Sequence, residues 1–321
     1  MKKVFCVFLI LCVCFNMCGC NGRSAYNDEK ITIVCTSFSA YDWVKELAGD
    51  ELSHIRLRYL GKKGVDMHSF QPSAEDMAAI KSCDLLIYVG GESEDWVEDA
   101  LAEDVNPDML VVKMLDAVGE DALAEEELPG ISGKEHEHEH DEEEYDEHVW
   151  LSPKKAALIV TEIEGCLEKL DGDKASYYRE NYNVYMEKLG ELDKGYREAV
   201  NGAAHKTIIF GDRFPFRYMT EDYGIDYYAA FNGCSAETEA SFETITFLAG
   251  RLDDLNLKYI IVIDGSDKRL ANTISESTKN KDKIIVELDS IQSVSTDDIE
   301  KGYTYIKAME ENLKILETVL Y

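Results

Sequence analysis

The stretch Ile31-Thr32-Ile33-Val34-Cys35 is a short apolar run between polar residues, and it predicts a buried β-strand. Similar runs follow at 55–60, 85–89 and 109–114, with helical patterns between them. A second alternation has strands at 207–211, 226–231, 258–263 and 283–288 and helices at 236–255, 267–278 and 298–320. Alternating strands and helices predict an α/β fold with two similar lobes, each a mostly parallel sheet covered on both faces.

Between the two alternations lies a long helical pattern at 174–200, with apolar and tyrosine side chains spaced by threes and fours. Such a helix is about 40 Å long and can connect two lobes as a stiff rod. We therefore expect an N-terminal lobe at 31–171, a connecting helix at 172–203 and a C-terminal lobe at 204–321. A ligand cleft is expected between the lobes, where the carboxyl ends of their strands meet.

The N-terminus predicts export. Met1-Lys2-Lys3 is positively charged, and residues 4–18 form an uncharged apolar run too short for a comfortable membrane span. We expect a signal peptide at 1–19. Met17-Cys18-Gly19-Cys20 resembles a bacterial lipobox, which implies a lipidated Cys20, a linker at 20–30 and a protein anchored at the outer face of the membrane. The alternative is ordinary secretion with Cys20 incidental.

Charge and cysteine content narrow the functional classes further. The 321 residues carry a formal net charge of −31, which argues against nucleic acid as a partner. Five of the nine cysteines lie within the first twenty residues. The others are far apart and lack CxxC spacing, so they are interpreted mainly as buried thiols, with a disulfide left open: Cys35, Cys83, Cys166 and Cys234.

Two histidines each precede a predicted helix. His68 lies in Gly64–Asp76, where Ser73 is a plausible helix cap, and His148 lies in Glu147–Pro153, just before Pro153 at a first helical position. Neutral imidazole is the commonest protein ligand for a transition metal. These histidines therefore predict a metal site.

The remaining histidines divide into two groups. An acidic loop at 119–147 contains three that alternate with glutamate, which predicts weak metal capture, although a solvated run of charge is the alternative: His136, His138 and His140. His54 and His205 have no motif around them and are interpreted as structural.

With these motifs, the chain resembles the solute-binding proteins of bacterial zinc and manganese ABC importers, the cluster A-I metal-binding family. The resemblance covers nearly the whole chain after the leader. It is strongest at Gly64–Asp76 and at His148-Val149-Trp150-Leu151-Ser152-Pro153, and looser at 233–239 and 305–320. The acidic histidine loop is similar to one common in zinc-binding members.

The resemblance implies the ligands His68, His148 and Asp289 but leaves a third position open. The family usually has His or Glu after the first strand of the second lobe, whereas this chain has Phe210-Gly211-Asp212-Arg213-Phe214 there. Asp212 is the nearest residue able to coordinate a metal, and the alternatives are Asp264, Glu237 or water. The alternative is that Asp212 pairs with Arg213 or Arg217.

Two imidazoles with one or two carboxylates suit Zn²⁺, with Mn²⁺ as the alternative. The resemblance implies a monomeric binding protein, not an enzyme, that delivers metal to an ABC permease and its ATPase. Two other classes compete: a metal-dependent hydrolase, for which neither HExxH nor G-x-S-x-G is present, and an adhesin-type surface lipoprotein with a structural metal.

Overall fold

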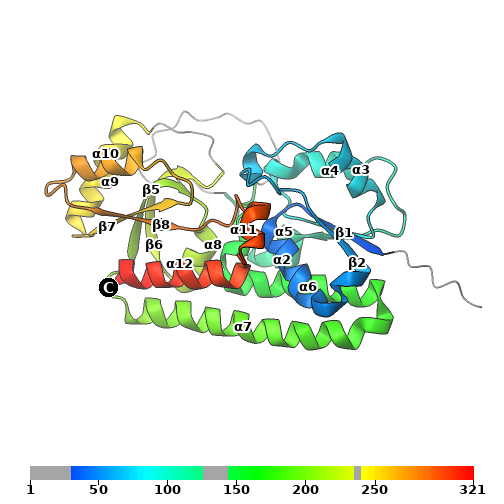
Figure 1. Cartoon of the computed structure of the whole chain (residues 1–321). Helices are drawn as coiled ribbons and strands as arrows, with labels where there is room; N and C mark the ends of the chain where they lie inside the picture. Colours follow the sequence, from blue (N-terminus) through cyan, green and yellow to red (C-terminus); the bar gives the residue numbers. More distant parts are fainter. Residues whose placement is uncertain (1–29, 126–143, 235–239) are drawn as a thin grey trace, which may run out of the picture. The chain divides into compact units, whose positions relative to one another are not determined.

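Two four-stranded parallel sheets form the framework of the protein (Figure 1). The computed structural model describes residues 30–125, 144–234 and 240–321, and Ile31–Tyr321 forms a single unit of structure. We call 31–171, around the first sheet, the N-terminal lobe and 204–321, around the second, the C-terminal lobe. The expected α/β fold with two parallel-sheet lobes is confirmed.

The first sheet has the strand order β2-β1-β3-β4. Its strands are β1 (Ile31–Cys35), β2 (Ile55–Tyr59), β3 (Leu85–Tyr88) and β4 (Leu110–Lys113). Its helices are α2 (Phe38–Ala48), α3 (Ala74–Ser82), α4 (Asp95–Leu101) and α5 (Met114–Val118), with short turns η1 (Gly49–His54), η2 (Met67–Ser69), η3 (Glu92–Glu94) and η4 (Gly119–Asp121). Successive side chains of a strand point to opposite faces of the sheet. On one face they pack against α3 and α4, and on the other face against α2 and α6 (Pro153–Leu170).

The second sheet repeats this plan with the order β6-β5-β7-β8. Its strands are β5 (Thr207–Phe214), β6 (Asp226–Asn232), β7 (Tyr259–Ile263) and β8 (Ile284–Leu288). Its helices are α8 (Arg217–Tyr223), α9 (Phe242–Asp254), α10 (Arg269–Ser277), α11 (Thr296–Glu300) and α12 (Tyr305–Leu320). In both sheets the strand order reverses between the two central strands. Open α/β sheets usually bind ligands at such a point, beyond the carboxyl ends of the strands.

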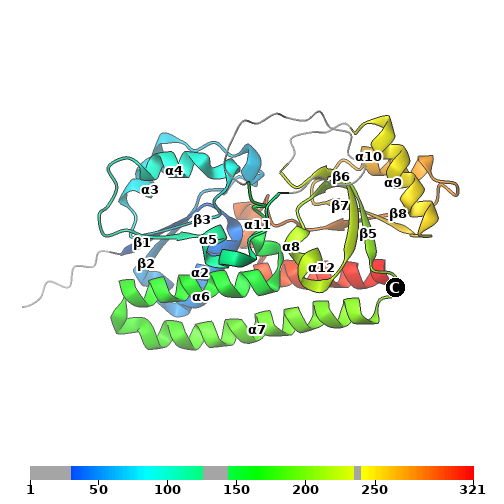
Figure 2. The ribbon, with the colours of Figure 1, turned by 180° about the vertical axis from the view of Figure 1, so that it is seen from behind.

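The long helix α7 (Ala175–Gly202) follows α6 and the short turn η6 (Gly172–Lys174). It packs against α6 and α2 of the N-terminal lobe and against α12 of the C-terminal lobe, and Figures 1 and 2 show it running beneath both sheets. Its buried stripe is rich in tyrosine, and the Tyr196 hydroxyl donates to the Met309 carbonyl at 2.8 Å. Because α7 contacts both lobes, it serves as the expected connecting rod. None of the described helices has both the length and the apolar character that crossing a membrane requires.

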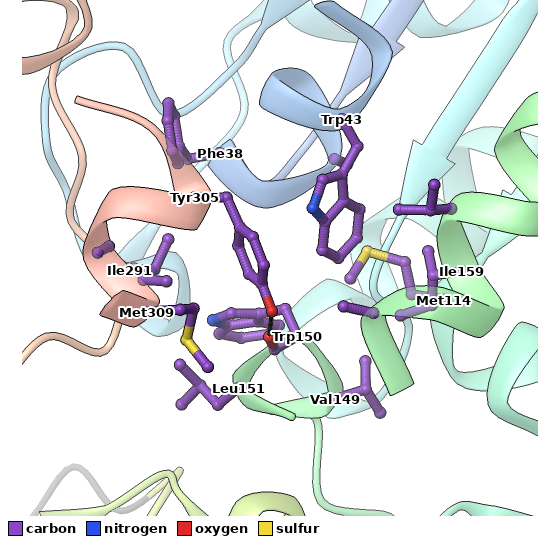
Figure 3. Packing of buried hydrophobic residues seen from close by; sticks show 14 of the residues in the cluster. Phe38, Trp43, Met114, Val149, Trp150, Leu151, Ile159, Ile291, Tyr305 and Met309 are labelled. Carbon is purple, nitrogen blue, oxygen red and sulfur yellow. Dashed lines mark hydrogen bonds between the residues drawn. The ribbon is translucent and has the colours of Figure 1, made fainter. Parts of the chain in front are cut away.

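Aromatic side chains from both lobes meet around Trp150 (Figure 3). The Trp150 indole N–H donates to the Ser290 carbonyl at 2.9 Å, and its own carbonyl accepts from the Tyr305 hydroxyl at 2.6 Å. Trp43 packs edge-on against Tyr305, and the centroids of the two rings are 5.1 Å apart. Trp150 lies in turn η5 (Val149–Leu151), next to His148, so the same contacts that join the lobes also fix the backbone beside that histidine.

Two expected helices differ from the structure. Helix α9 begins at Phe242, later than the expected position 236, because the Ser241 side chain accepts from the Thr244 N–H and caps the helix there. The expected single helix at 298–320 is instead α11 and α12. Gly302 adopts φ +85° between them, a conformation that ends a helix, and Thr304 caps α12.

Candidate metal centre

His68 is held by the carboxylate of Asp66 in turn η2. Asp66 Oδ1 accepts hydrogen bonds from the His68 backbone N–H at 3.0 Å and from its ring Nδ1 at 2.8 Å. A carboxylate only accepts, so Nδ1 carries a hydrogen, and in the neutral imidazole Nε2 is then the nitrogen with the lone pair. The Asp66 carboxylate therefore fixes both the ring orientation and the tautomer that metal binding through Nε2 requires.

His148 has the same arrangement with Asp146. Asp146 Oδ1 accepts from the His148 backbone N–H at 2.9 Å and from Nδ1 at 3.1 Å. The His148 ring is fully buried, and its centroid lies 5.3 Å from the centroid of the Trp150 ring. Both histidines thus follow an aspartate by two residues, in Asp66-Met67-His68 and Asp146-Glu147-His148.

The two imidazoles lie next to each other, with ring centroids 5.2 Å apart. Both Nε2 atoms are buried and have no hydrogen-bond partner among the residues that the structure describes. One ligand atom each of His68, His148 and Cys234 lie within 4.8 Å of one another, and among the residues that the structure describes these three form a group able to hold a metal ion. Leaving polar atoms buried and unpaired costs free energy, and a bound cation would satisfy them.

Glu147 adds a carboxylate beside this group. Its Oε1 accepts from the Ser93 N–H at 2.8 Å. Its Oε2 is buried 3.8 Å from His68 Nε2 and has no hydrogen-bond partner in the described part of the chain. Burial raises the pKa of Glu147 to about 7, partly offset by the Ser93 N–H and by His68. A cation nearby would stabilise the ionised carboxylate and so lower this pKa.

Cys234 follows β6 in the C-terminal lobe. Burial, together with the nearby carboxyl groups of Glu147, Asp146 and Glu125, raises the pKa of the thiol well above its usual range. The thiol also hydrogen-bonds with the Glu125 carboxyl group. In the metal-free protein Cys234 is therefore protonated.

A cleft of about 1140 Å³ opens beside the group. It is lined by His68, Cys234 and Arg213, and by acidic residues that outnumber the basic ones: Glu92, Asp95, Glu98, Asp116, Glu125, Glu144 and Glu147 against Lys113 and Arg213. Walls of predominantly one charge raise the local concentration of oppositely charged ions. The cleft therefore favours the entry of cations.

Asp212 does not belong to the group, and a β-bulge accounts for its position. The register of β5 against β6 shifts between Phe210 and Arg213, which places one extra residue in β5. A bulge changes the face to which the following side chains point. Asp212 Oδ1 accepts from the Arg213 backbone N–H at 2.9 Å, while the Arg213 guanidinium reaches the other lobe and pairs with Asp66 Oδ2 at 2.6 Å.

Asp289 is also outside the group. Its Oδ2 accepts from the Tyr303 hydroxyl at 2.5 Å and its Oδ1 from the Ile291 N–H at 2.8 Å. Burial raises its pKa, and the Tyr303 hydrogen bond opposes this. Asp264 Oδ1 accepts from the Ser290 N–H at 2.7 Å. Both carboxyl groups thus hold the loop after β8, whose Ser290 carbonyl contacts Trp150.

Several expected site residues lie outside the described residues: Glu237, His136, His138, His140 and Cys20. His54 and His205 are exposed at the surface, away from the metal group. The four cysteines of the described chain are free, three buried and Cys234 half-buried.

The sequence argument did not identify Cys234 and Glu147 as neighbours of the histidine pair. A lone cysteine without a second nearby cysteine carries no metal signature in a sequence. The supporting carboxylates were detectable, because Asp-x-His occurs at both histidines. A carboxylate bonded to the second ring nitrogen is the usual partner of a metal-binding histidine.

The protein has two α/β lobes joined by a long helix, and a pair of carboxylate-held imidazoles lies beside an acidic cleft. This is the arrangement expected of the solute-binding class. The comparison with protein families agrees: the chain belongs to the family ZnuA, zinc-uptake complex component A, periplasmic, whose model matches residues 33–319.

Two relatives of this chain have names that agree with the description of the family. The zinc-binding lipoprotein AdcA of Streptococcus pneumoniae is 32% identical over 321 residues, covering 99% of this chain and 61% of AdcA. The chain thus spans about three-fifths of that relative's length. The high-affinity zinc uptake system protein ZnuA of Bacillus subtilis is 28% identical over 318 residues, covering 98% of this chain and 94% of that protein.

Solved structures show the same fold. The crystal structure of the Zn(II)-bound ZnuA-like domain of S. pneumoniae AdcA has a TM-score of 0.70 and 29% sequence identity, and the match covers 91% of this chain and 99% of that domain. The curated relatives are thus described as a lipoprotein and an uptake protein, and the family as periplasmic, which places the relatives outside the cytoplasm.

Proposed function

We propose that this protein binds zinc outside the cytoplasm and delivers it to the permease of an ABC importer. The observation that carries the proposal is the pair of buried, unpaired Nε2 atoms of His68 and His148. Each imidazole is already oriented by an aspartate, so the site needs little rearrangement to accept a cation. Binding rather than catalysis is the role assigned to it.

His68 and His148 are the proposed ligands from the N-terminal lobe. Imidazole nitrogen favours zinc over manganese, which prefers oxygen ligands, so Zn²⁺ is the proposed cargo and Mn²⁺ the alternative. Asp289 is the proposed carboxylate of the C-terminal lobe, to be brought to the ion by a closing movement of the two lobes. Its support is that the adjacent residue, Ser290, already contacts Trp150 beside His148. Asp212 would need the β5 bulge to rearrange.

Location and partners follow from the same proposal. Cys20 would carry the lipid that holds a monomeric binding protein at the outer face of the membrane, next to the permease and its ATPase. The support is the lipobox-like sequence and the description of AdcA as a lipoprotein. The histidines at 136, 138 and 140 would collect zinc weakly, and the acidic lining of the cleft would attract the ion.

A thermal titration tests the proposal. Zinc at about 100 times its Kd is expected to stabilise the protein by about 2.7 kcal/mol, because the ion binds the folded chain only, and a chelator should reverse the shift. Manganese at the same concentration should stabilise it less. The control is the His68→Ala/His148→Ala double variant, which should not respond. An equal zinc response in the double variant would contradict the assignment.

A further inference from the structure

Cys234 approaches the histidine pair from the opposite lobe. It follows β6 directly after Gly233, and its ligand atom lies within 4.8 Å of those of both His68 and His148. Gly233 makes this approach possible: a Cβ there would lie 2.8 Å from His148 Cε1 and 2.9 Å from the Phe214 carbonyl oxygen. The chain thus has a glycine at the position where a side chain would push Cys234 away from His148.

The histidines provide independent support for a ligand at this point. His148 is fully buried, and neither its Nε2 nor that of His68 has a hydrogen-bond partner within residues 30–125, 144–234 and 240–321. Both Nδ1 atoms already donate to aspartates, so the Nε2 atoms are the nitrogens left to bind a cation. Two imidazoles and a thiol with ligand atoms within 4.8 Å of one another provide the donor types of zinc sites that contain cysteine.

We infer that Cys234, as a thiolate, is the ligand at the third position of the site, supplied by the C-terminal lobe in addition to Asp289, and that its sulfur makes the site selective for zinc over manganese. This inference rests on the proposed function. When the ion binds, the Sγ–H bond breaks, the proton passes to solvent and a Zn–S bond forms, with no change of oxidation state. The dication supplies the charge that deprotonates a coordinating thiol.

The bulge in β5 explains why a cysteine that follows β6 takes this place. The position expected to supply the third ligand presents Arg213 instead, whose guanidinium cannot coordinate a metal and pairs with Asp66. The end of β6 is adjacent to the end of β5, since Phe214 pairs with Asn232. Sulfur is a softer donor than the carboxylate oxygen of Asp212, and soft donors bind zinc much better than manganese.

Cobalt(II) provides the decisive probe, because a thiolate bound to Co²⁺ gives a charge-transfer band in the near ultraviolet that imidazole and carboxylate ligands do not give. The purified protein loaded with one Co²⁺ should show this band. Cys234→Ser should lose the band, while Cys166→Ser, which changes a buried cysteine of α6 outside the metal group, should keep it. A wild-type spectrum without the band overturns the inference, whether or not the variant folds.

Zinc and manganese titrations complete the test. Cys234→Ser should weaken zinc binding by about 10- to 100-fold or more, since loss of even an outer partner of a ligand has an effect of that size. Its manganese affinity should change far less, so that the preference for zinc falls. Unchanged zinc affinity overturns the inference. If the wild type binds neither cobalt nor zinc, the proposed function fails as well, whereas binding without the band removes only Cys234 from the site.

Discussion

Substitution of His148 by alanine is expected to remove tight zinc binding, with an affinity loss greater than 100-fold. The change deletes a nitrogen that is buried, belongs to a ring oriented by Asp146 and has no hydrogen-bond partner among the described residues. Removing only an outer partner of a metal ligand costs roughly 10- to 100-fold, so loss of the ligand itself should exceed that range. Isothermal titration with zinc is the measurement.

A matched control and a second variant make this result interpretable. His54→Ala removes an exposed histidine in η1 and should leave zinc affinity unchanged. Because His148 is buried, its variant should also be checked for folding by circular dichroism. His68→Ala, at a more accessible ring, should show the same loss of affinity. Wild-type affinity in either His68→Ala or His148→Ala would remove that residue from the site.

Trp150→Ala is expected to produce the largest loss of stability, about 3–5 kcal/mol in the free energy of unfolding. The indole is almost fully buried among residues of both lobes (Figure 3), and its loss would leave a cavity and an unpaired Ser290 carbonyl. Zinc affinity should fall too, because the His148 ring lies against Trp150. Urea unfolding of the metal-free protein measures the first effect and titration the second.

Phe242→Ala provides the comparison for that variant. Phe242 is 77% exposed at the start of α9, so truncating it should change the free energy of unfolding by no more than about 0.5 kcal/mol. Similar losses for Trp150→Ala and Phe242→Ala would show that the core around Trp150 does not hold the lobes together.

Much of the fold could be predicted because its signals are local. Each strand is an apolar run, and the tyrosine stripe of α7 repeats at helical spacing, so element type followed from pattern alone. Helix ends were less predictable. The break between α11 and α12 depends on the positive φ of Gly302, and a glycine inside a helical pattern does not by itself show whether the helix continues.

The residues of the site also differ in how far the sequence predicts them. His68 and His148 stand in motifs that can be recognised along the chain, and the fold brings them together. Asp212 is expected from its place after a strand, as the nearest residue able to coordinate a metal. The β5 bulge adds one residue there, and Arg213 lines the cleft. Cys234 has no signal of its own, because its proximity to His148 depends on Gly233 and on the contact between lobes.

Native mass spectrometry after exposure to an equimolar mixture of zinc and manganese tests the central claim most directly. The protein is expected to retain one tightly bound zinc ion per chain, and the His68→Ala/His148→Ala double variant none. Retention of manganese in place of zinc, or of the same tightly bound zinc by the double variant, would contradict the account.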